Sequence, residues 1–267
     1  MAIKMIVTDL DGTLLTSNHT VSSQTAAALK QANDQGILVM PASGRPLSGV
    51  VSYFKEIGIS PDNYAVVFNG GMVQKLTGEV VVSHLLSYED LTDLIKLSEG
   101  SQCTLQFMQK DCYLTLESQL SDLMKLTTKL TKMPFKFIKK EELSSDFTFI
   151  KAEFLGSASE IAKLKAKIPK DWYQRWEISG SGDQIIEINA PGATKGNAVH
   201  ELAEKLKIKD SEVVVFGDQA NDLSMFKNDS FCKVAMGNAI DDLKKRATFV
   251  TASHDEDGIA KALKQIL

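Results

Sequence analysis

The chain has 267 residues, enough for one large domain or two smaller ones. Its 43% hydrophobic and 24% charged residues are ordinary for a soluble globular protein, and its net charge of −4 argues against nucleic-acid or membrane-surface binding. No apolar run approaches the roughly 20 residues of a spanning helix. The chain opens on a predicted strand rather than an export signal, so we expect a cytoplasmic protein.

Cysteine and histidine usage narrows the chemistry further. The 3 cysteines include no CxxC pair, and the 4 histidines are scattered along the chain. An odd number of scattered cysteines indicates reduced thiols. Neither a zinc site nor a Ser-His-Asp triad is favoured.

Residues 1–83 alternate short apolar strands with helices and end in a predicted hairpin. Such alternation predicts a parallel sheet with right-handed crossovers. The two helices are expected to end at Gly36 and Gly58, because glycine readily takes the left-handed conformation that closes a helix. The expected strands span residues 3–8, 37–40, 64–68, 72–76 and 79–83.

Residues 84–189 show a different pattern, in which the predicted strands come in pairs and are richer in aromatic residues. This pattern suits an antiparallel sheet with helices on one face. We therefore predict a separate α+β domain inserted into the first. Its expected strands span residues 104–108, 113–116, 135–138, 147–155, 172–178 and 184–189, and its expected helices 87–98, 120–130 and 159–167.

From residue 190 the alternation of strand and helix resumes. The sequence therefore predicts an α/β protein with a discontinuous parallel-sheet domain, residues 1–83 and 190–267, that contains the inserted domain of residues 84–189. The last expected strands span residues 213–216, 231–235 and 249–251.

Two aspartates stand one residue apart at the end of the first predicted strand, in Asp9-Leu10-Asp11-Gly12-Thr13. Such crowded carboxylates repel each other, which costs free energy unless a cation or a reacting phosphoryl group is nearby. Gly12 permits a sharp turn or a close approach of the backbone to a ligand. Asp and Gly are also common in plain turns, so Asp-x-Asp by itself indicates no more than a turn.

Three further polar clusters follow predicted strands or begin helices. Because ligands bind beyond the carboxyl ends of the strands in open α/β sheets, segments distant in sequence are expected to meet there. Taken singly, each cluster has a plainer interpretation: a Ser-Gly loop, a solvated lysine or an acid at a helix N-terminus. The clusters are Ser43-Gly44-Arg45, Lys195, and Asp218 with Asn221 and Asp222.

In order and type, these four clusters resemble the four motifs of the haloacid dehalogenase (HAD) superfamily of phosphotransferases. The resemblance covers essentially the whole parallel-sheet domain and, in the insertion, position and size more than motif. It implies a Rossmann-like core with an inserted α+β cap. Resemblance to the Cof-type subfamily, with its class IIB cap, is carried by the insertion after the third strand, Asn221-Asp222, Asn69-Gly70-Gly71, Met236-Gly237-Asn238-Ala239 and Asp257-Gly258.

The resemblance implies a phosphatase that hydrolyses small phosphomonoesters, in the first place sugar phosphates. Asp9 would be the nucleophile, because a carboxylate that attacks phosphorus splits hydrolysis into two easier steps through an aspartyl phosphate. Asp11 would be the general acid and then the general base. Lys195 would hold Asp9 and the phosphoryl group together by its charge.

Phosphate binding is expected from the second cluster and from Asn221. Ser43 and the amide of Gly44 would hydrogen-bond the phosphoryl oxygens. Asn221 resembles the phosphate-contacting asparagine of the family. Arg45 has two readings, a substrate contact or a surface cation.

The resemblance also implies Mg²⁺, a hard cation that prefers a few carboxylates, waters and a substrate phosphate. Asp9 and Asp218 would be direct ligands, together with the backbone carbonyl of Asp11. Asp222 would act mainly from outside this first set of ligands, orienting waters or Lys195.

The expected partner is a small phosphorylated metabolite, with no nucleic acid or membrane and with a monomer or weak homo-oligomer as the assembly. A phosphosugar mutase of the same superfamily is the alternative enzyme. A non-catalytic phosphate-ligand binding or regulatory protein is the alternative class, but it would have no need of a general acid such as Asp11. A receiver domain fits poorly with the large insertion, and no nucleotide P-loop is present.

Overall fold

The computed structural model describes residues 2–180 and 182–267, and the chain divides into two compact units. One unit takes in the chain up to Val82 together with Thr194–Leu267, and the other is Ser83–Ala193. The sequence patterns placed these limits at 83/84 and 189/190. The second limit lies further along because Ala190 and Ala193 are buried in the hydrophobic cluster of the inserted unit.

The discontinuous unit is built on a five-stranded parallel sheet with the order β14-β13-β12-β1-β2. Strand β1 is an interior strand, so that Thr8 at its end lies between Phe216 of β12 and Pro41 of β2. All four β1 residues are buried, as expected of an apolar strand covered on both faces. The strands are β1 (Met5–Thr8), β2 (Leu38–Pro41), β12 (Val213–Gly217), β13 (Cys232–Ala235) and β14 (Phe249–Val250).

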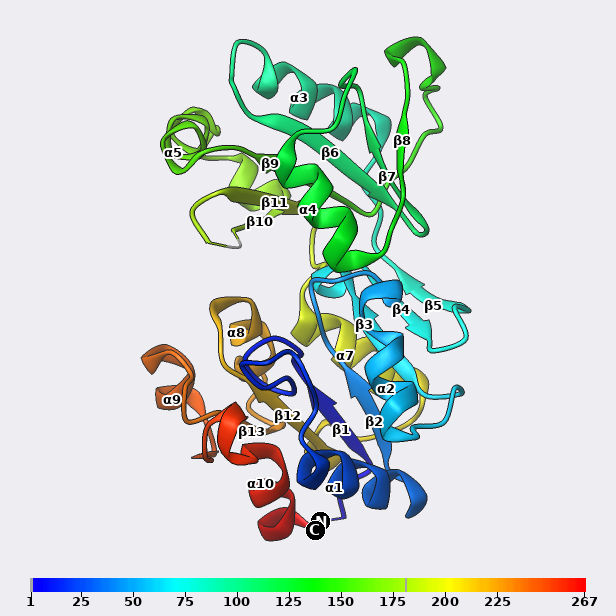
Figure 1. Cartoon of the computed structure of the whole chain (residues 1–267), viewed down its shortest axis with the longest axis vertical. Coiled ribbons are helices and arrows are strands. Elements are labelled where there is room, and N and C mark those ends of the chain that lie inside the picture. The colour runs from blue at the N-terminus through cyan, green and yellow to red at the C-terminus, as the bar shows by residue number, and fades with distance from the viewer. Residues whose placement is uncertain (1, 181) are drawn as a thin grey trace. The chain divides into compact units, whose positions relative to one another are not determined.

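Helices cover both faces of this sheet. Figure 1 shows α1 and α10 on one side and α7 on the other. The side chain of Ser22 caps α1. Gly58 ends α2 in the left-handed conformation, as the sequence predicted. The helices are α1 (Ser23–Asp34), α2 (Val51–Ile57), α7 (Lys195–Lys205), α8 (Leu223–Phe226), α9 (Asp241–Arg246) and α10 (Gly258–Ile266).

The third predicted strand does not continue the parallel ladder. Strand β3 (Tyr64–Val67) instead forms a three-stranded sheet with β4 (Met72–Lys75) and β5 (Val80–Ser83). Beyond the end of β2, Ser43 donates its backbone N–H to Val66 at 2.9 Å. Pro41, two residues earlier and therefore on the same side, has no N–H to donate, so the ladder cannot extend backward.

The inserted unit has a six-stranded sheet with the order β10-β11-β9-β6-β7-β8. Its pairings are antiparallel except for β7 with β8, which are parallel. Helices α3 (Tyr88–Ser98) and α5 (Ala158–Lys167) pack on one face through the hydrophobic cluster. The strands are β6 (Thr104–Gln109), β7 (Cys112–Thr115), β8 (Phe135–Phe137), β9 (Lys151–Leu155), β10 (Glu177–Ser179) and β11 (Ile185–Asn189).

Helix α4 (Asp122–Thr131) lies on the opposite face of this sheet, so the expectation of helices on one face only was wrong. Cys112 and Leu114 belong to the hydrophobic cluster, whereas Tyr113 between them points the other way and hydrogen-bonds with Thr131 of α4. The reason lies in the topology, because the parallel pair β7 and β8 needs a crossover connection, and α4 is that crossover.

The predicted strand over residues 172–178 was also wrong in its first half. Residues Trp172–Arg175 form a helical turn, α6, and only β10 follows as a strand. Arg175 donates to Asp90 and Asp93 at the start of α3, and the indole N–H of Trp176 donates to Asp90 at 3.0 Å. These tertiary contacts override the strand preference of aromatic residues.

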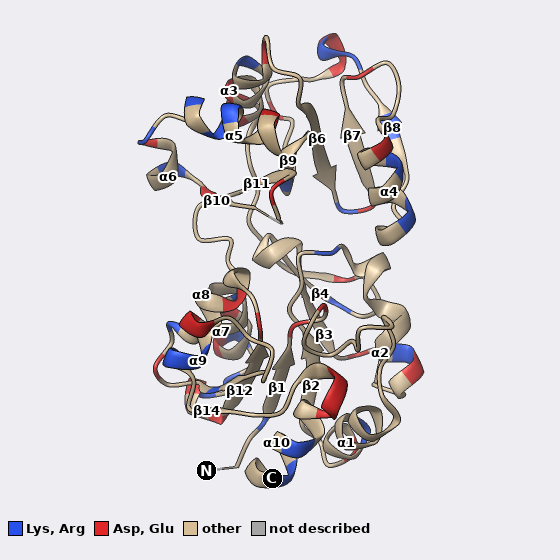
Figure 2. Ribbon diagram, turned by 60° about the vertical axis from the view of Figure 1, so that its left-hand side comes forward, with Lys and Arg blue, Asp and Glu red and all other residues tan. Residues whose placement is uncertain are grey.

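Charges of both signs are spread over both units (Figure 2). Ion pairs such as Lys30–Asp34 at 2.5 Å join neighbouring turns of one helix. Among the residues that the structure describes, no helix is both long enough and apolar enough to cross a bilayer.

Candidate active site

Asp9 and Asp11 leave the end of β1 in opposite environments. The Asp9 side chain is buried, and its backbone N–H donates to Phe216 of β12 at 3.1 Å. The Asp11 side chain is half-exposed. Gly12 has φ +80°, and a Cβ at this position would lie 2.4 Å from Oδ2 of Asp218. Only glycine therefore lets this loop approach the end of β12 so closely.

Lys195 begins α7 and is fully buried, with the hydroxyl of Thr194 capping the helix. Its ammonium donates to Oδ1 of Asp9 at 2.6 Å and to Oδ1 of Asp222 at 2.7 Å. Burial alone would lower the pKa of Lys195, but the charges of Asp222 and Asp9 more than offset it and raise this pKa above its ordinary value. Lys195 is therefore a fixed cation at neutral pH, not a solvated lysine.

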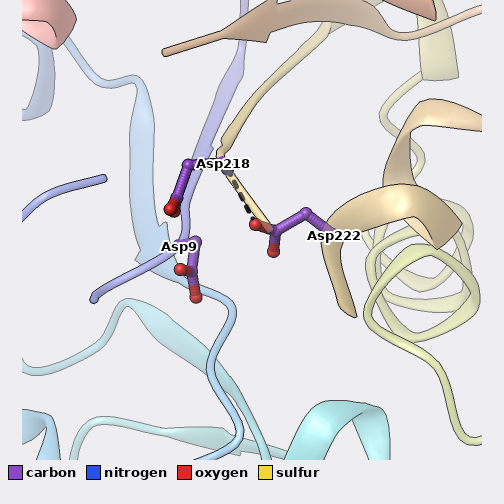
Figure 3. A group of neighbouring side chains, drawn as sticks. All are labelled: Asp9, Asp218 and Asp222. Atoms are coloured by element: carbon purple, nitrogen blue, oxygen red, sulfur yellow. Dashed lines mark hydrogen bonds between the residues drawn. The ribbon is translucent and has the colours of Figure 1, made fainter. Parts of the chain in front are cut away.

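Asp222 is held by the turn that follows β12. Its Oδ2 accepts the backbone N–H groups of Asp218 at 2.9 Å and of Gln219 at 3.1 Å, the first of which Figure 3 shows as a dashed line. Because Oδ1 accepts from Lys195, both carboxylate oxygens are engaged. A Cβ on Gly217 would lie 2.7 Å from that of Asp222, so glycine is needed for this turn to close.

Asp218 completes a group of three buried acids. One oxygen each from Asp9, Asp218 and Asp222 lies within 4.8 Å of the others, and Thr13 donates its hydroxyl to Oδ1 of Asp218 at 2.7 Å. Burial and the charge of Asp222 raise the pKa of Asp9 to about 8, against the opposing effect of Lys195. Burial raises the pKa of Asp218 to about 6. Three acids around one lysine are thus short of positive charge.

This shortage fits a divalent cation. Of the two Asp9 oxygens, only Oδ1 accepts a hydrogen bond from the described residues, and its partner is Lys195. Asp9 and Asp218 therefore offer hard oxygen donors next to each other, which suits Mg²⁺. Both oxygens of Asp222 already accept hydrogen bonds, which makes this carboxylate less suited to bind a cation directly.

Ser43, Gly44 and Arg45 form the second cluster, at the end of β2. Ser43 is buried, and its hydroxyl accepts the backbone N–H of Arg45 at 3.2 Å. The Arg45 guanidinium forms a two-pronged ion pair with Asp11, with Nε 2.9 Å from Oδ2 and Nη2 2.5 Å from Oδ1. The sequence left Arg45 as a substrate contact or a surface cation. In the structure its guanidinium is instead paired with Asp11 in the loop after β1.

Asn221 is exposed and lies at the edge of this group. Its side-chain amide is 3.5 Å from Oδ1 of Asn69, a buried residue with φ 57° in the turn after β3. Asn69 also lies against Gly44, where an added Cβ would be 3.0 Å from its Oδ1. The turn after β3 therefore borders on both the second and the fourth cluster.

Sequence reasoning assigned no role to Thr13, Asn69 or Asn238, although all three lie in motifs that carry the family resemblance. Their position in the sequence could have indicated a role, because each follows a strand of this unit within a few residues. The structure places Thr13 on Asp218, Asn69 between Gly44 and Asn221, and Asn238 on the carbonyl of Gly12 at 2.8 Å.

Known proteins resemble this chain over nearly its whole length. A family model described as haloacid dehalogenase-like hydrolase matches residues 6–263. The protein YxeH of Bacillus subtilis (strain 168) is 34% identical over 266 residues, covering 99% of this chain and 98% of the relative. The 5-amino-6-(5-phospho-D-ribitylamino)uracil phosphatase YwtE of the same organism is 31% identical over 286 residues, with the same two coverages.

A solved structure agrees with the family match. It is that of a HAD subclass IIB sugar phosphatase, with 26% sequence identity, a TM-score of 0.80 and 98% coverage of both chains. The likeness extends over both units of the chain, and it confirms the predicted fold class of a parallel-sheet core with an inserted cap.

Proposed function

Because the chain belongs to the haloacid dehalogenase-like hydrolases, we propose that it is a Mg²⁺-dependent phosphatase of small phosphomonoesters, in the first place sugar phosphates. The observation that carries the proposal is the buried Asp9 carboxylate, fixed by Lys195 beside Asp218. The substrate class is supported by two relatives, one a phosphatase of a phosphoribityl compound and the other a sugar phosphatase.

Asp9 and Asp218 would hold the cation with the backbone carbonyl of Asp11, and Asp222 would orient Lys195 and the turn carrying Asp218. When bound, Mg²⁺ neutralises the excess negative charge and polarises the phosphoryl oxygens. Lys195 neutralises part of the same negative charge whether or not the ion is bound.

In the first step an Asp9 oxygen attacks phosphorus, and the bond from phosphorus to the ester oxygen breaks. Asp11, which takes up a proton from solvent once Arg45 has moved from it to the phosphoryl dianion, gives that proton to the ester oxygen, so the leaving group departs as a neutral alcohol. The half-exposed position of Asp11 suits a group that must meet an incoming ester. Ser43, the amide of Gly44 and Asn221 would bind the phosphoryl oxygens, and a phosphoryl dianion would compete with Asp11 for Arg45.

In the second step water attacks the phosphorus of the aspartyl phosphate. Asp11, now a carboxylate, takes a proton from that water, and the bond from phosphorus to Asp9 breaks. Inorganic phosphate leaves, and both aspartates return to their starting protonation states. Lys195 stays bonded to Asp9 and Asp222 throughout and so keeps the nucleophile in place.

The test is steady-state hydrolysis of p-nitrophenyl phosphate with and without Mg²⁺ by the native protein and by Asp9→Asn. We expect metal-dependent phosphate release that vanishes in Asp9→Asn, with an acid-stable phosphoprotein trapped only in the native chain. A folded native protein that releases no phosphate from any small ester would refute the proposal. A sugar-phosphate panel should also be examined for isomerised product, which would identify a mutase instead.

A further inference from the structure

Asn238 lies in the turn after β13 and uses both ends of its side-chain amide. Its Nδ2 donates to the carbonyl of Gly12 at 2.8 Å, and its Oδ1 accepts the backbone N–H of His254 at 3.0 Å. A carbonyl only accepts and an N–H only donates, so these two partners fix which end of the amide faces which. The side chain thus joins three segments that are far apart in sequence.

The same turn also holds the end of β12. Met236 donates its backbone N–H to Gly217 at 3.1 Å, and Ile240 donates to the carbonyl of Asp218 at 3.0 Å. The backbone of the turn therefore fixes the Asp218 segment, while the Asn238 side chain fixes the loop after β1. The relative position of the two segments depends on both sets of bonds.

The two aspartates of the loop do not depend on Asn238 to the same degree. Asp9 is anchored by its backbone bond to Phe216 and by Lys195. Asp11 is half-exposed, and the Arg45 guanidinium that holds its carboxylate would be drawn away by a bound phosphoryl dianion. Asp11 also comes immediately before Gly12, whose carbonyl is the atom that Asn238 binds. Gly12 itself has no side chain that could restrict its backbone. Loss of the Asn238 bond should therefore disturb Asp11 more than Asp9.

We propose that Asn238 is a positioning residue that holds Asp11 at the distance and angle its proton transfer requires. The inference rests on the proposed function, because it assigns Asn238 a role in the general acid step. Its signature is a dependence on the leaving group. An ester whose alcohol needs a proton should suffer when Asp11 is misplaced, whereas p-nitrophenolate leaves without one.

The first experiment compares kcat/KM of the native protein and Asn238→Asp with p-nitrophenyl phosphate and benzyl phosphate. The substitution keeps the shape and the acceptor for His254 but sets an anion against the Gly12 carbonyl. We expect a loss of about tenfold or more with benzyl phosphate, the size of one lost hydrogen bond to the transition state. With p-nitrophenyl phosphate we expect a loss below about threefold. Equal losses with both esters, or none, would overturn the proposal.

Asn228→Asp is the matched control. Asn228 also uses both ends of its amide, donating to Asp210 at 2.7 Å and accepting the N–H of Ser230 at 3.0 Å. It precedes β13 rather than following it, so it lies toward the amino ends of the parallel strands, away from the carboxyl ends where Asp11 lies. This variant should leave the ratio of the two kcat/KM values unchanged. A shift like that of Asn238→Asp would contradict a specific role for Asn238.

Two further readouts separate positioning from general damage. In an Asp11→Asn background, Asn238→Asp should change the ratio of the two kcat/KM values no further, because the group it positions is gone. In native-state hydrogen exchange, the amides of Leu14 and Leu15, which close the loop onto Leu10, should exchange faster in Asn238→Asp. The inference would be overturned if Asn238→Asp changed the ratio of kcat/KM values as much in the Asp11→Asn background as in the native protein. It would also be overturned if the exchange of the two amides stayed unchanged. The exchange result stands even if the native protein releases no phosphate, an outcome that would refute the proposed function alone.

Discussion

Each unit of the protein buries one lysine between two carboxylates. The two clusters differ in the elements that supply the carboxylates and in the number of acids around the lysine. Lys195 lies between Asp9 and Asp222. Lys151 in the inserted unit lies 2.8 Å from Glu153 and also contacts Glu187. In both lysines burial lowers the pKa and the two acids raise it by more. A buried lysine with acidic partners is therefore no sufficient sign of an active site.

The partners of Lys151 come from the middle of regular strands. Glu153 of β9 stands opposite Glu187 of β11 on one side and opposite Gln106 of β6 on the other. Gln106 donates its amide to Glu153 at 2.6 Å, and Ser179 of β10 donates its hydroxyl to Glu187 at 3.3 Å. These contacts follow from strand register, so the cluster ties neighbouring strands together.

The partners of Lys195 come from loops and helix starts beyond the carboxyl ends of parallel strands. A third acid, Asp218, lies beside them without a lysine of its own, and its neighbour Asp9 keeps an oxygen that accepts no hydrogen bond from the described residues. Placement at the strand ends and a surplus of acid distinguish this cluster from the other, and they are the reasons why we propose a cation and a phosphoryl group for it alone.

The largest expected effect comes from Lys195→Met. Removing an electrostatic stabiliser of the reacting groups should lower kcat for p-nitrophenyl phosphate by about 10²–10³-fold. Steady-state kinetics at saturating Mg²⁺ measure this, with circular dichroism to show that the variant is folded. Activity within a few-fold of native would remove the distinction drawn between the two lysines.

Lys151→Met should show the opposite profile. Two buried glutamates lose their cation, and breaking a buried pair costs about 3–5 kcal/mol of unfolding free energy. Urea unfolding should show this loss, while the folded variant keeps its kcat for p-nitrophenyl phosphate within about twofold. A loss of activity as large as that of Lys195→Met, at temperatures where the variant is folded, contradicts the comparison.

Mg²⁺ should stabilise one cluster only. At about 100 times its dissociation constant, the ion should add roughly 2–3 kcal/mol to the free energy of unfolding. The gain should persist in Lys151→Met and disappear in Asp218→Asn. Urea titrations in MgCl₂ and in NaCl of equal ionic strength measure it, and an undiminished gain in Asp218→Asn would place the ion elsewhere.

The smallest expected effect is a pH dependence of the inserted cluster. Burial raises the pKa of Glu153, which Lys151 lowers and Glu187 raises further. Folding therefore favours the protonated acid, and its contribution to stability is present below the ordinary pKa of a glutamate and is lost as pH rises. Glu153→Gln, which cannot ionise, should gain stability relative to the native protein as the pH of urea titrations rises from about 4, near that ordinary pKa, to about 8. A constant difference across this range counts against the assignment.

The sequence patterns singled out the residues of the first cluster and none of those of the second. Asp9, Lys195 and Asp218 stand at strand ends or helix starts, and although each alone has a plainer interpretation, their order and type along the chain carry the family resemblance. Lys151 and Glu153 alternate with apolar residues in a strand, which is the pattern of a solvent-facing row. They are buried because residues distant in the chain cover and pair with them, and no local signal encodes that.

The same limit explains the errors in the fold. The strand expected over residues 172–178 fails because Arg175 and Trp176 are bound by acids on α3, more than 80 residues earlier. The sequence showed Arg45 as a cation beside a helix start but could not show that Asp11, distant by 34 positions, would be its partner. The sequence shows which side chains can form ion pairs and hydrogen bonds, whereas the fold decides which residues become their partners.

The position of β1 between β2 and β12 has a consequence for the order in which the protein can assemble on the ribosome. One edge of β1 pairs with β2 close behind it, but the other edge waits for β12, as Met5 pairs with Val213. The inserted unit, Ser83–Ala193, is continuous and emerges complete before that strand exists. Domains generally fold as units during synthesis, so the unit in the middle of the chain can fold first. The one that begins at the N-terminus must then be finished last, with a long-range closure that is slow for reasons of chain entropy.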